Sequence, residues 1–230
     1  MGSRSVGKSS SGRLRPPLWL FIVSTALMAA PLYAQTSPLN DTGQTQCFEG
    51  GVLAKCTVAN TGDGAPHPRQ DGRFGRDAQA GAGEAGFDFT KLDASGDPLE
   101  ADASAWSCVR DNVTGLIWEV KTPANATATF NFADASAVHA AAVNSAALCG
   151  YNNWRVPTRR ELLSIVHHGR SSPAIDPAFF LNTRSSFYWS SDISAPNPAL
   201  AWSVNFGRGN ASAVIQSSGV IHVRLVRSGQ

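Results

Sequence analysis

The first 34 residues carry the pattern of a secretory signal. Four basic residues and no acid precede an apolar run over residues 18–30, and a small residue, Ala34, comes just before Gln35. A basic head, an apolar middle and a small-residue exit are typical of a cleavable signal peptide. The apolar run is shorter than the about 20 residues that span a bilayer; an uncleaved membrane anchor is the alternative. We therefore expect residues 1–34 to be removed and the rest to fold outside the cytoplasm, in the periplasm or at the cell surface.

Setting this segment aside changes the formal charge. The full chain has 19 Lys and Arg against 17 Asp and Glu, a formal charge of +2. Four of the basic residues lie within residues 1–34, which leaves 15 against 17 and a formal charge of −2. This balance gives no support for a nucleic-acid partner. No second apolar stretch is long enough to span a bilayer, so an integral membrane protein is not expected after cleavage.

Cysteine usage favours disulfides. The chain has four cysteines, none in a CxxC pair, so zinc and thioredoxin-type chemistry have poor support. An even number in an exported chain is typical of disulfide bonds. Of the three pairings, Cys47–Cys56 with Cys108–Cys149 is the simplest, because it closes one local loop and one longer loop. The other pairings and free buried thiols stay open.

Residues 35–105 are irregular in composition and rich in Gly, Ala, Asp, Pro and Ser. Such a segment buries little apolar surface, so long helices are not expected in it. Phe74, Phe87, Phe89 and Leu92 are the side chains that can dock it on a core. We interpret it as an extended lead-in that wraps the following domain, with a flexible linker as the alternative.

Residues 106–230 have the apolar patterning of a folded domain. Residues 115–120 form a short β-prone run, and the apolar spacing over 131–148 predicts an amphipathic helix. Thr158 and Glu161 are three apart, which predicts a capping box at the start of a second helix. We expect this second helix to continue to the His-His-Gly sequence that follows its apolar face.

The last third of the chain is β in character. Residues 187–190 are a short β-prone run, and apolar residues alternate with small or polar ones over 200–206. Strands over 211–216 and 221–225 follow after short turns, which predicts a three-strand antiparallel meander. Two helices followed by an antiparallel sheet define an α+β fold class.

Motifs for catalysis, metal binding or cofactor binding are missing. The sequence has no GxSxG elbow, HExxH pair, P-loop or sugar-binding calcium motif, so we expect no catalytic residues, no metal and no cofactor. The tryptophans at positions 118, 154, 189 and 202 lie in apolar segments. We expect them in the core, and a sugar-stacking set is the alternative.

Five motifs, in fixed order, are similar to the Lcl C-terminal domain family of bacterial exported proteins. They are CVRDNVTGLIWEVKT, LCGYNNWRVPTRRELLSIV, SSFYWSSD, AWSVNFGRGN and VIHVRLVRSG. With the lead-in strings QDGRFGRDA and GFDFTK, the resemblance covers roughly residues 66–230. We therefore divide the chain into a signal peptide over 1–34, a lead-in over 35–105 and an Lcl C-terminal-like domain over 106–230.

The resemblance implies a C-type-lectin-like fold and a disulfide between Cys108 and Cys149. In a collagen-like adhesin, a related domain forms a trimeric head that binds sulfated glycans; this sequence has no Gly-x-y stalk, so that role does not carry over whole. A more distant similarity joins the same fold to formylglycine-generating oxidases. Their chemistry needs reactive cysteines near the C-terminus, and here none follows Cys149, so the similarity implies a shared scaffold.

Arginines are the candidate ligand-binding residues, because a guanidinium pairs with sulfate or carboxylate through two hydrogen bonds. Those at 184, 208, 224 and 227 fall in or beside the predicted sheet, where a solvated surface is the alternative reading. The glycine-flanked turn predicts a shallow anion-binding platform made of Asn205, Arg208, Asn210 and Arg224.

The sequence thus favours an exported, non-catalytic recognition domain of adhesin type, whose partner is an anionic glycan or another envelope component. An enzyme on the oxidase-like scaffold and a structural part of an envelope assembly are the alternatives. Whether the chain forms a homo-oligomer stays open.

Overall fold

The computed structural model describes residues 1–2, 40–56, 70–74 and 85–229. Two compact units separate at Thr36, and the second, Ser37–Gln230, holds every helix and strand described below. The predicted signal peptide over residues 1–34 lies almost entirely outside the described residues. Among those that are described, no helix is both long and apolar enough to cross a bilayer.

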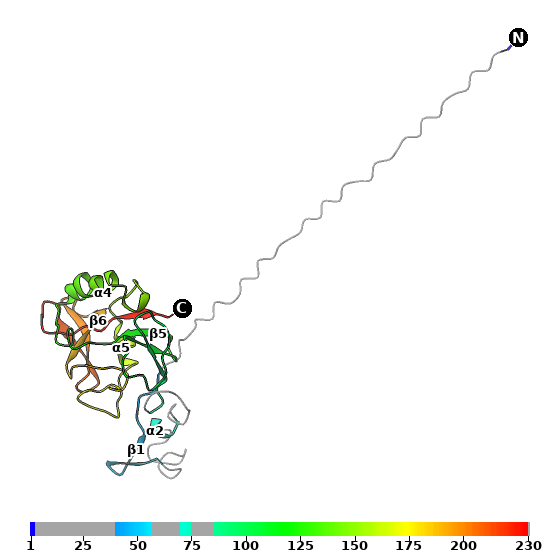
Figure 1. The fold of residues 1–230 in the computed structure, drawn as a ribbon. Coiled ribbons are helices and arrows are strands. Elements are labelled where there is room, and N and C mark those ends of the chain that lie inside the picture. Colours follow the sequence, from blue (N-terminus) through cyan, green and yellow to red (C-terminus); the bar gives the residue numbers. More distant parts are fainter. Residues whose placement is uncertain (3–39, 57–69, 75–84, 230) are drawn as a thin grey trace. The chain divides into compact units, whose positions relative to one another are not determined.

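Short antiparallel strands and a few helices make up the described chain (Figure 1). The strands are β1 (Gln46–Glu49), β2 (Val52–Lys55), β3 (Phe89–Leu92), β4 (Cys108–Asp111), β5 (Leu116–Glu119), β6 (Phe187–Ile193), β7 (Leu200–Asn205), β8 (Asn210–Ile215) and β9 (Val226–Ser228). The helices are α2 (Asp71–Phe74), α3 (Phe132–Asp134), η2 (Ala135–Ala140), α4 (Ala141–Ser145), η3 (Leu148–Gly150) and α5 (Arg159–Leu163). The α+β class predicted from the sequence is confirmed.

One antiparallel sheet has the order β3-β4-β5-β9 and joins the lead-in to the C-terminus. Phe89 of β3 pairs with Asp111 of β4, and Trp118 of β5 pairs with Val226 of β9. Phe87, Phe89 and Leu92 are each only 1% exposed, so this part of the lead-in packs in the core.

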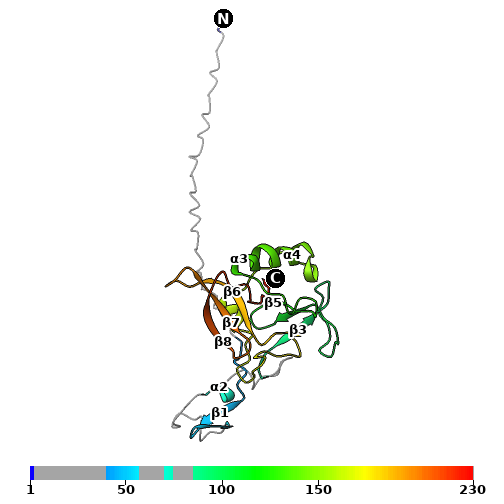
Figure 2. The same cartoon turned by 90° about the vertical axis from the view of Figure 1, so that its left-hand side faces the viewer.

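The second sheet has the order β6-β7-β8, with its three strands side by side (Figure 2). The predicted meander is wrong in its last strand. Residues 221–225 form no strand beside β8: Ile221 bridges Phe130, His222 makes a single parallel bridge to Tyr188 of β6, and Val226 begins β9 of the other sheet. The sheet is completed instead by β6, whose Tyr188 pairs with Val204 of β7.

The first predicted helix is present as the continuous run α3–η2–α4. Asn131 caps its start by accepting a hydrogen bond from the backbone N–H of Asp134. The middle of the run is π-helical over Ala135–Ala140, and it ends at Ser145, three residues before the predicted limit.

The capping box of the second predicted helix, α5, is confirmed. Thr158 Oγ1 accepts from Glu161 N at 3.2 Å, and Glu161 Oε2 accepts from Thr158 N at 2.7 Å. The helix ends at Leu163, short of the predicted His-His-Gly stop. His167 is instead buried, with its ring centroid 5.5 Å from that of Phe87, so packing against the lead-in replaces the last helical turn.

Both predicted disulfides are present. Cys47–Cys56 closes the β1–β2 hairpin, and Cys108–Cys149 ties β4 to η3 after the long helix. Trp118, Trp154 and Trp189 are buried as expected, at 2% exposure or less. The fourth tryptophan, Trp202, is partly exposed, so its assignment to the core is wrong.

Candidate functional site

The turn between β7 and β8 is fixed by hydrogen bonds to Asn205. Its carbonyl accepts from Gly209 N at 2.7 Å, and its side-chain Oδ1 accepts from Gly207 N at 2.7 Å. Asn205 is therefore half-buried and engaged in the turn, rather than directed to solvent as strand alternation predicted. Arg208 and Asn210 are exposed, as a ligand-binding turn requires.

Both glycines of the turn lie against other segments of the domain. A Cβ on Gly207 would lie 3.1 Å from the carbonyl oxygen of Ser185. Gly209 has a φ of +73°, and a Cβ there would lie 2.9 Å from Val166 Cγ1 and 3.4 Å from His168 Nδ1. The turn is thus close-packed on both sides of Arg208, which holds the base of that side chain in one place.

This packing places two further basic residues beside the turn. Arg184 immediately precedes Ser185, and His168 lies beside Gly209; both side chains are exposed. We call Arg184, Arg208 and His168 the basic turn surface. Segments 167–175, 183–190 and 205–212, which form it, contain no Asp or Glu, so nothing within them neutralises the two guanidinium groups.

Arg224 does not belong to this surface, which corrects the sequence prediction. It is fully buried, and its Nη1 and Nη2 donate to the Glu119 carbonyl at 2.7 Å and to Thr183 Oγ1 at 2.6 Å. The predicted platform assumed that residues 221–225 form the third strand of the meander. Because these residues instead cross between the sheets, Arg224 points into the core.

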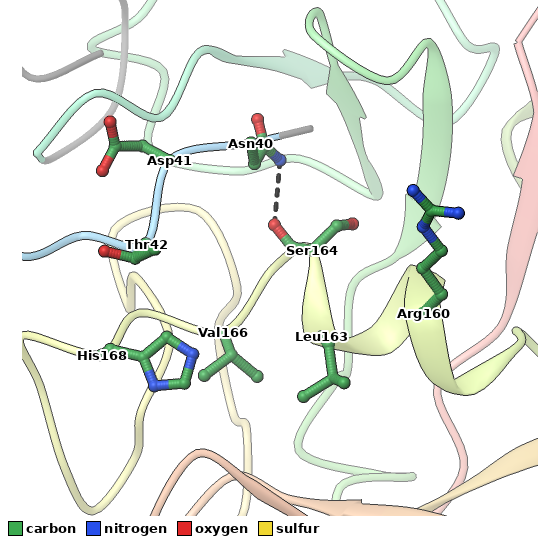
Figure 3. A pocket seen from close by; sticks show the side chains of 8 residues that line it. All are labelled: Asn40, Asp41, Thr42, Arg160, Leu163, Ser164, Val166 and His168. Atoms are coloured by element: carbon green, nitrogen blue, oxygen red, sulfur yellow. Dashed lines mark hydrogen bonds between the residues drawn. The ribbon is translucent and has the colours of Figure 1, made fainter. Parts of the chain in front are cut away.

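A cleft of about 230 Å³ adjoins the basic turn surface at His168 (Figure 3). Its lining residues come from the lead-in, from α5 and from the segment after α5: Asn40, Asp41, Thr42, Arg160, Leu163, Ser164, Val166 and His168. Asn40 Nδ2 bridges the two sides, donating to the Ser164 carbonyl at 3.0 Å and to Asp111 Oδ2 at 2.6 Å. The lead-in therefore forms one wall of this cleft, and Val166 and His168 link it to the turn.

Residues 107–227 match the Lcl C-terminal domain family. The chain belongs to this family. No curated protein and no solved structure matches the chain. The matched span contains the whole basic turn surface and Arg224, whereas the lead-in wall of the cleft lies outside it.

The Lcl C-terminal domain of this chain buries a second polar cluster around Glu119. Lys121 Nζ donates to Glu119 Oε1 at 2.8 Å, His139 Nε2 lies 3.1 Å from Oε2, and the backbone N–H of Leu225 donates to Oε2 at 3.0 Å. Burial raises the pKa of Glu119, but the His139 hydrogen bond and the Lys121 charge outweigh it and lower the pKa to about 2. Glu119 is 1% exposed, so the cluster is an internal ion-pair network of the domain.

A third feature is a hollow of about 540 Å³ between the start of the long helix and the segment before α5. Phe132 and Val156 give it an apolar floor, and Ser136 and Ser191 give it hydroxyl groups. Its charged residue, Arg155, is bound by both terminal nitrogens to the Glu161 carboxylate, at 2.8 and 2.6 Å. The hollow therefore presents little net charge to an anion.

Within the described residues, no group of three or more His, Cys, Asp or Glu side chains could hold a metal ion. The sequence singled out Arg208 and Asn210, and both are exposed at the turn. Arg184 was predicted to lie in or beside the sheet but was not included in the platform, and His168 was interpreted only as a helix terminus. Neither residue is near Arg208 in the sequence, so only the folded contacts of Gly207 and Gly209 reveal the pairing.

Proposed function

We propose that this chain is an exported, non-catalytic recognition domain that binds an anionic glycan through the basic turn surface. The observation that carries the proposal is the position of exposed Arg208 on a close-packed turn. The two glycines of this turn lie against Ser185, which follows exposed Arg184, and against exposed His168. Two guanidinium groups on a fixed base suit sulfate or carboxylate, which accept paired hydrogen bonds.

Export is supported by the basic and apolar pattern of residues 1–34 and by the two disulfides, which persist in oxidising compartments. The periplasm or the cell surface is the proposed location. A C-type-lectin-like fold is proposed on the family resemblance, and the small antiparallel sheets with few helices are compatible with it.

A binding role is favoured over an enzymatic one because the clustered acid–base groups are buried. Glu119, Lys121 and His139 lie together, but they are at most 7% exposed and are bonded to one another. Exposed Arg184 and Arg208 can contact a ligand without opening the core. An enzyme on an oxidase-like scaffold remains the second candidate, and a structural envelope component the third.

The test is binding of sulfated and uronate glycans by the purified chain, with wild type compared to the Arg184→Ala/Arg208→Ala variant. We expect the double variant to lose about tenfold in affinity, because exposed ionic contacts contribute about 0.5–1 kcal/mol each. Its melting temperature should stay unchanged, since both side chains are exposed.

Arg110→Ala is the matched control, because Arg110 is a partly exposed arginine on β4 of the other sheet. It should bind as wild type does. Equal loss in the control and the double variant would reject the basic turn surface. Absence of binding to every anionic glycan would favour the structural-component alternative.

A further inference from the structure

Strand β8 is the open edge of the β6-β7-β8 sheet. Its six residues, NASAVI, contain no charge and no proline, and all six pair with β7 in an unbroken register. Natural proteins usually protect an edge strand with charges, prolines, bulges or a covering segment. Among the described residues, β8 has no charge, proline or bulge, and its end alone meets other chain segments: Ser218 N donates to the Ile215 carbonyl, and Phe132 N to the carbonyl of the next residue, Gln216.

The other edges of the two larger sheets are protected. β6 has a register shift between Trp189 and Ile193, and the backbone of Trp189 is bonded to the His222 carbonyl. β9 is covered by an isolated bridge between Val226 and Arg155. β3 is covered by the chain that follows it, since Leu99 N donates to the Lys91 carbonyl. The contrast marks β8 as the edge left open for a partner.

The outward backbone groups of β8 can be identified from its neighbour. Within β7, the carbonyls of Leu200 and Trp202 face β6, because they accept from Ser194 N and Ser190 Oγ. Ladder hydrogen bonds alternate in direction along an antiparallel pair. The cross-strand partners of these residues, Ile215 and Ala213, therefore direct their backbone groups away from β7, as does Ala211. The Ile215 carbonyl accepts from Ser218 N at 3.0 Å in the turn that follows.

Side chains beside this edge are apolar and partly exposed. Ile215 is 55% exposed, and its direct partner Leu200 is half-buried. Ala213 lies opposite Trp202, whose side chain is also only partly covered. These residues share one face of the sheet, so a strand added at β8 would extend that face and cover part of Ile215.

We propose that β8 pairs antiparallel with β8 of a second copy of this chain, about a two-fold axis at Ala213. In this register, the Ala213 N–H of each copy donates to the Ala213 C=O of the other, and the Ile215 N–H of each copy donates to the Ala211 C=O of the other. The two three-stranded sheets become one six-stranded sheet.

A second copy fits this edge better than a charged or bulky partner. The outward-facing residues at 211, 213 and 215 are spaced symmetrically about Ala213, so the strand is its own antiparallel complement. With no charge in β8, no like charges oppose one another in the self-pair. The methyl side chain of Ala213 leaves room at the axis, where two copies of the same side chain must face each other.

The experiment measures association of the purified, oxidised chain by sedimentation velocity over micromolar to millimolar concentration. Wild type should show a monomer–dimer equilibrium. Ala213→Lys and Ala213→Glu should each weaken dimerisation by about tenfold or more, because like charges then lie directly opposite across the axis. An equimolar mixture of the two variants should restore the dimer, since each Lys then faces a Glu.

Thr127→Lys is the charge-matched control, because Thr127 is exposed in the loop after β5. It should dimerise as wild type does. Recovery in the mixture shows that both variants are folded, so misfolding cannot imitate the result. A wild type that is monomeric throughout, a larger assembly unaffected by the two variants, or a mixture that stays monomeric overturns the proposal.

Discussion

The guanidinium carbon of Arg159 lies 4.2 Å from the ring centroid of Trp202. Arg159 is the first residue of α5, and its backbone N–H donates to Asp192 Oδ2 at 2.6 Å. Trp202 lies on β7 and is partly exposed. The start of α5 is thus attached to the sheet by a cation–π contact and a charge-assisted hydrogen bond on the surface.

Trp202→Ala should therefore cost much less stability than a substitution in the core. We expect a loss of about 1–2 kcal/mol, from one cation–π contact and partial apolar burial. Trp189→Ala, at a position that is fully buried, should cost about 3–5 kcal/mol. Denaturant unfolding of the two variants measures the difference, and equal losses would show that Trp202 is a core residue after all.

Thr158→Ala should destabilise the domain by about 1 kcal/mol, because it removes the N-cap acceptor of α5. Thr158→Ser retains the hydroxyl and should unfold at nearly the same denaturant concentration as wild type. If both variants lose the same amount, the loss of the threonine methyl is responsible and the cap contributes nothing measurable.

Local patterns in the sequence predicted the local features correctly. The Thr158–Glu161 spacing is a complete capping-box signal, since both partners lie in one turn. The cysteine pairing that the sequence favoured as the simplest of three is also present, and the family resemblance had implied its Cys108–Cys149 bond. Such features can be predicted because their residues either are close together in the sequence or are chemically distinctive.

Features that depend on long-range packing were predicted wrongly. The alternation over residues 221–225 is a genuine strand pattern, yet these residues connect the two sheets instead of pairing with β8. Arg224 was therefore placed on the surface, although it is fully buried. Nothing local distinguishes a surface arginine from one that donates to the Glu119 carbonyl, 105 positions away.

The Glu119 network should make stability fall in acid. Burial opposes ionisation of Glu119, but His139 and Lys121 lower its pKa to about 2, below the ordinary value of 4.5. A carboxyl group whose pKa is lower in the folded protein contributes stability at pH values above its pKa in the unfolded chain. This contribution is lost as the pH falls through its pKa in the folded protein. We expect the free energy of unfolding to decrease between about pH 4.5 and pH 2 for this reason.

Glu119→Gln isolates this contribution. The variant should be less stable than wild type near neutral pH by about 3–5 kcal/mol, because Lys121 and Arg224 then lack a buried counter-charge. Its stability should also change less between pH 4.5 and pH 2. Burial raises the pKa of Asp111, so this residue adds stability as the pH falls. The effect is the same in both proteins and cancels in the comparison. Parallel pH profiles for the two proteins would contradict the assignment.

Gly209→Ala should weaken both stability and glycan binding. A Cβ would contact Val166 Cγ1 at 2.9 Å, and the φ of +73° costs a non-glycine residue about 1–2 kcal/mol. Gly219→Ala is the matched control, because a Cβ there meets no atom within 4 Å. Thermal unfolding and glycan titration of both variants provide the measurements, and a Gly209→Ala protein that binds normally would show that the turn need not be fixed.

Replacing Arg208 by lysine separates charge from hydrogen-bond geometry at the proposed glycan site. Lysine keeps the charge but cannot present two parallel N–H groups to a sulfate or carboxylate. We expect Arg208→Lys to bind an anionic glycan more weakly than wild type and more tightly than Arg208→Ala. Affinity should decline with salt for all three proteins, and more steeply for wild type and Arg208→Lys than for Arg208→Ala, because exposed ionic contacts are screened over about 8–10 Å at 0.1–0.15 M salt. Titrations at two salt concentrations test this. An affinity that does not change with salt concentration, or an Arg208→Ala variant that binds as tightly as wild type, would show that Arg208 is not part of the site.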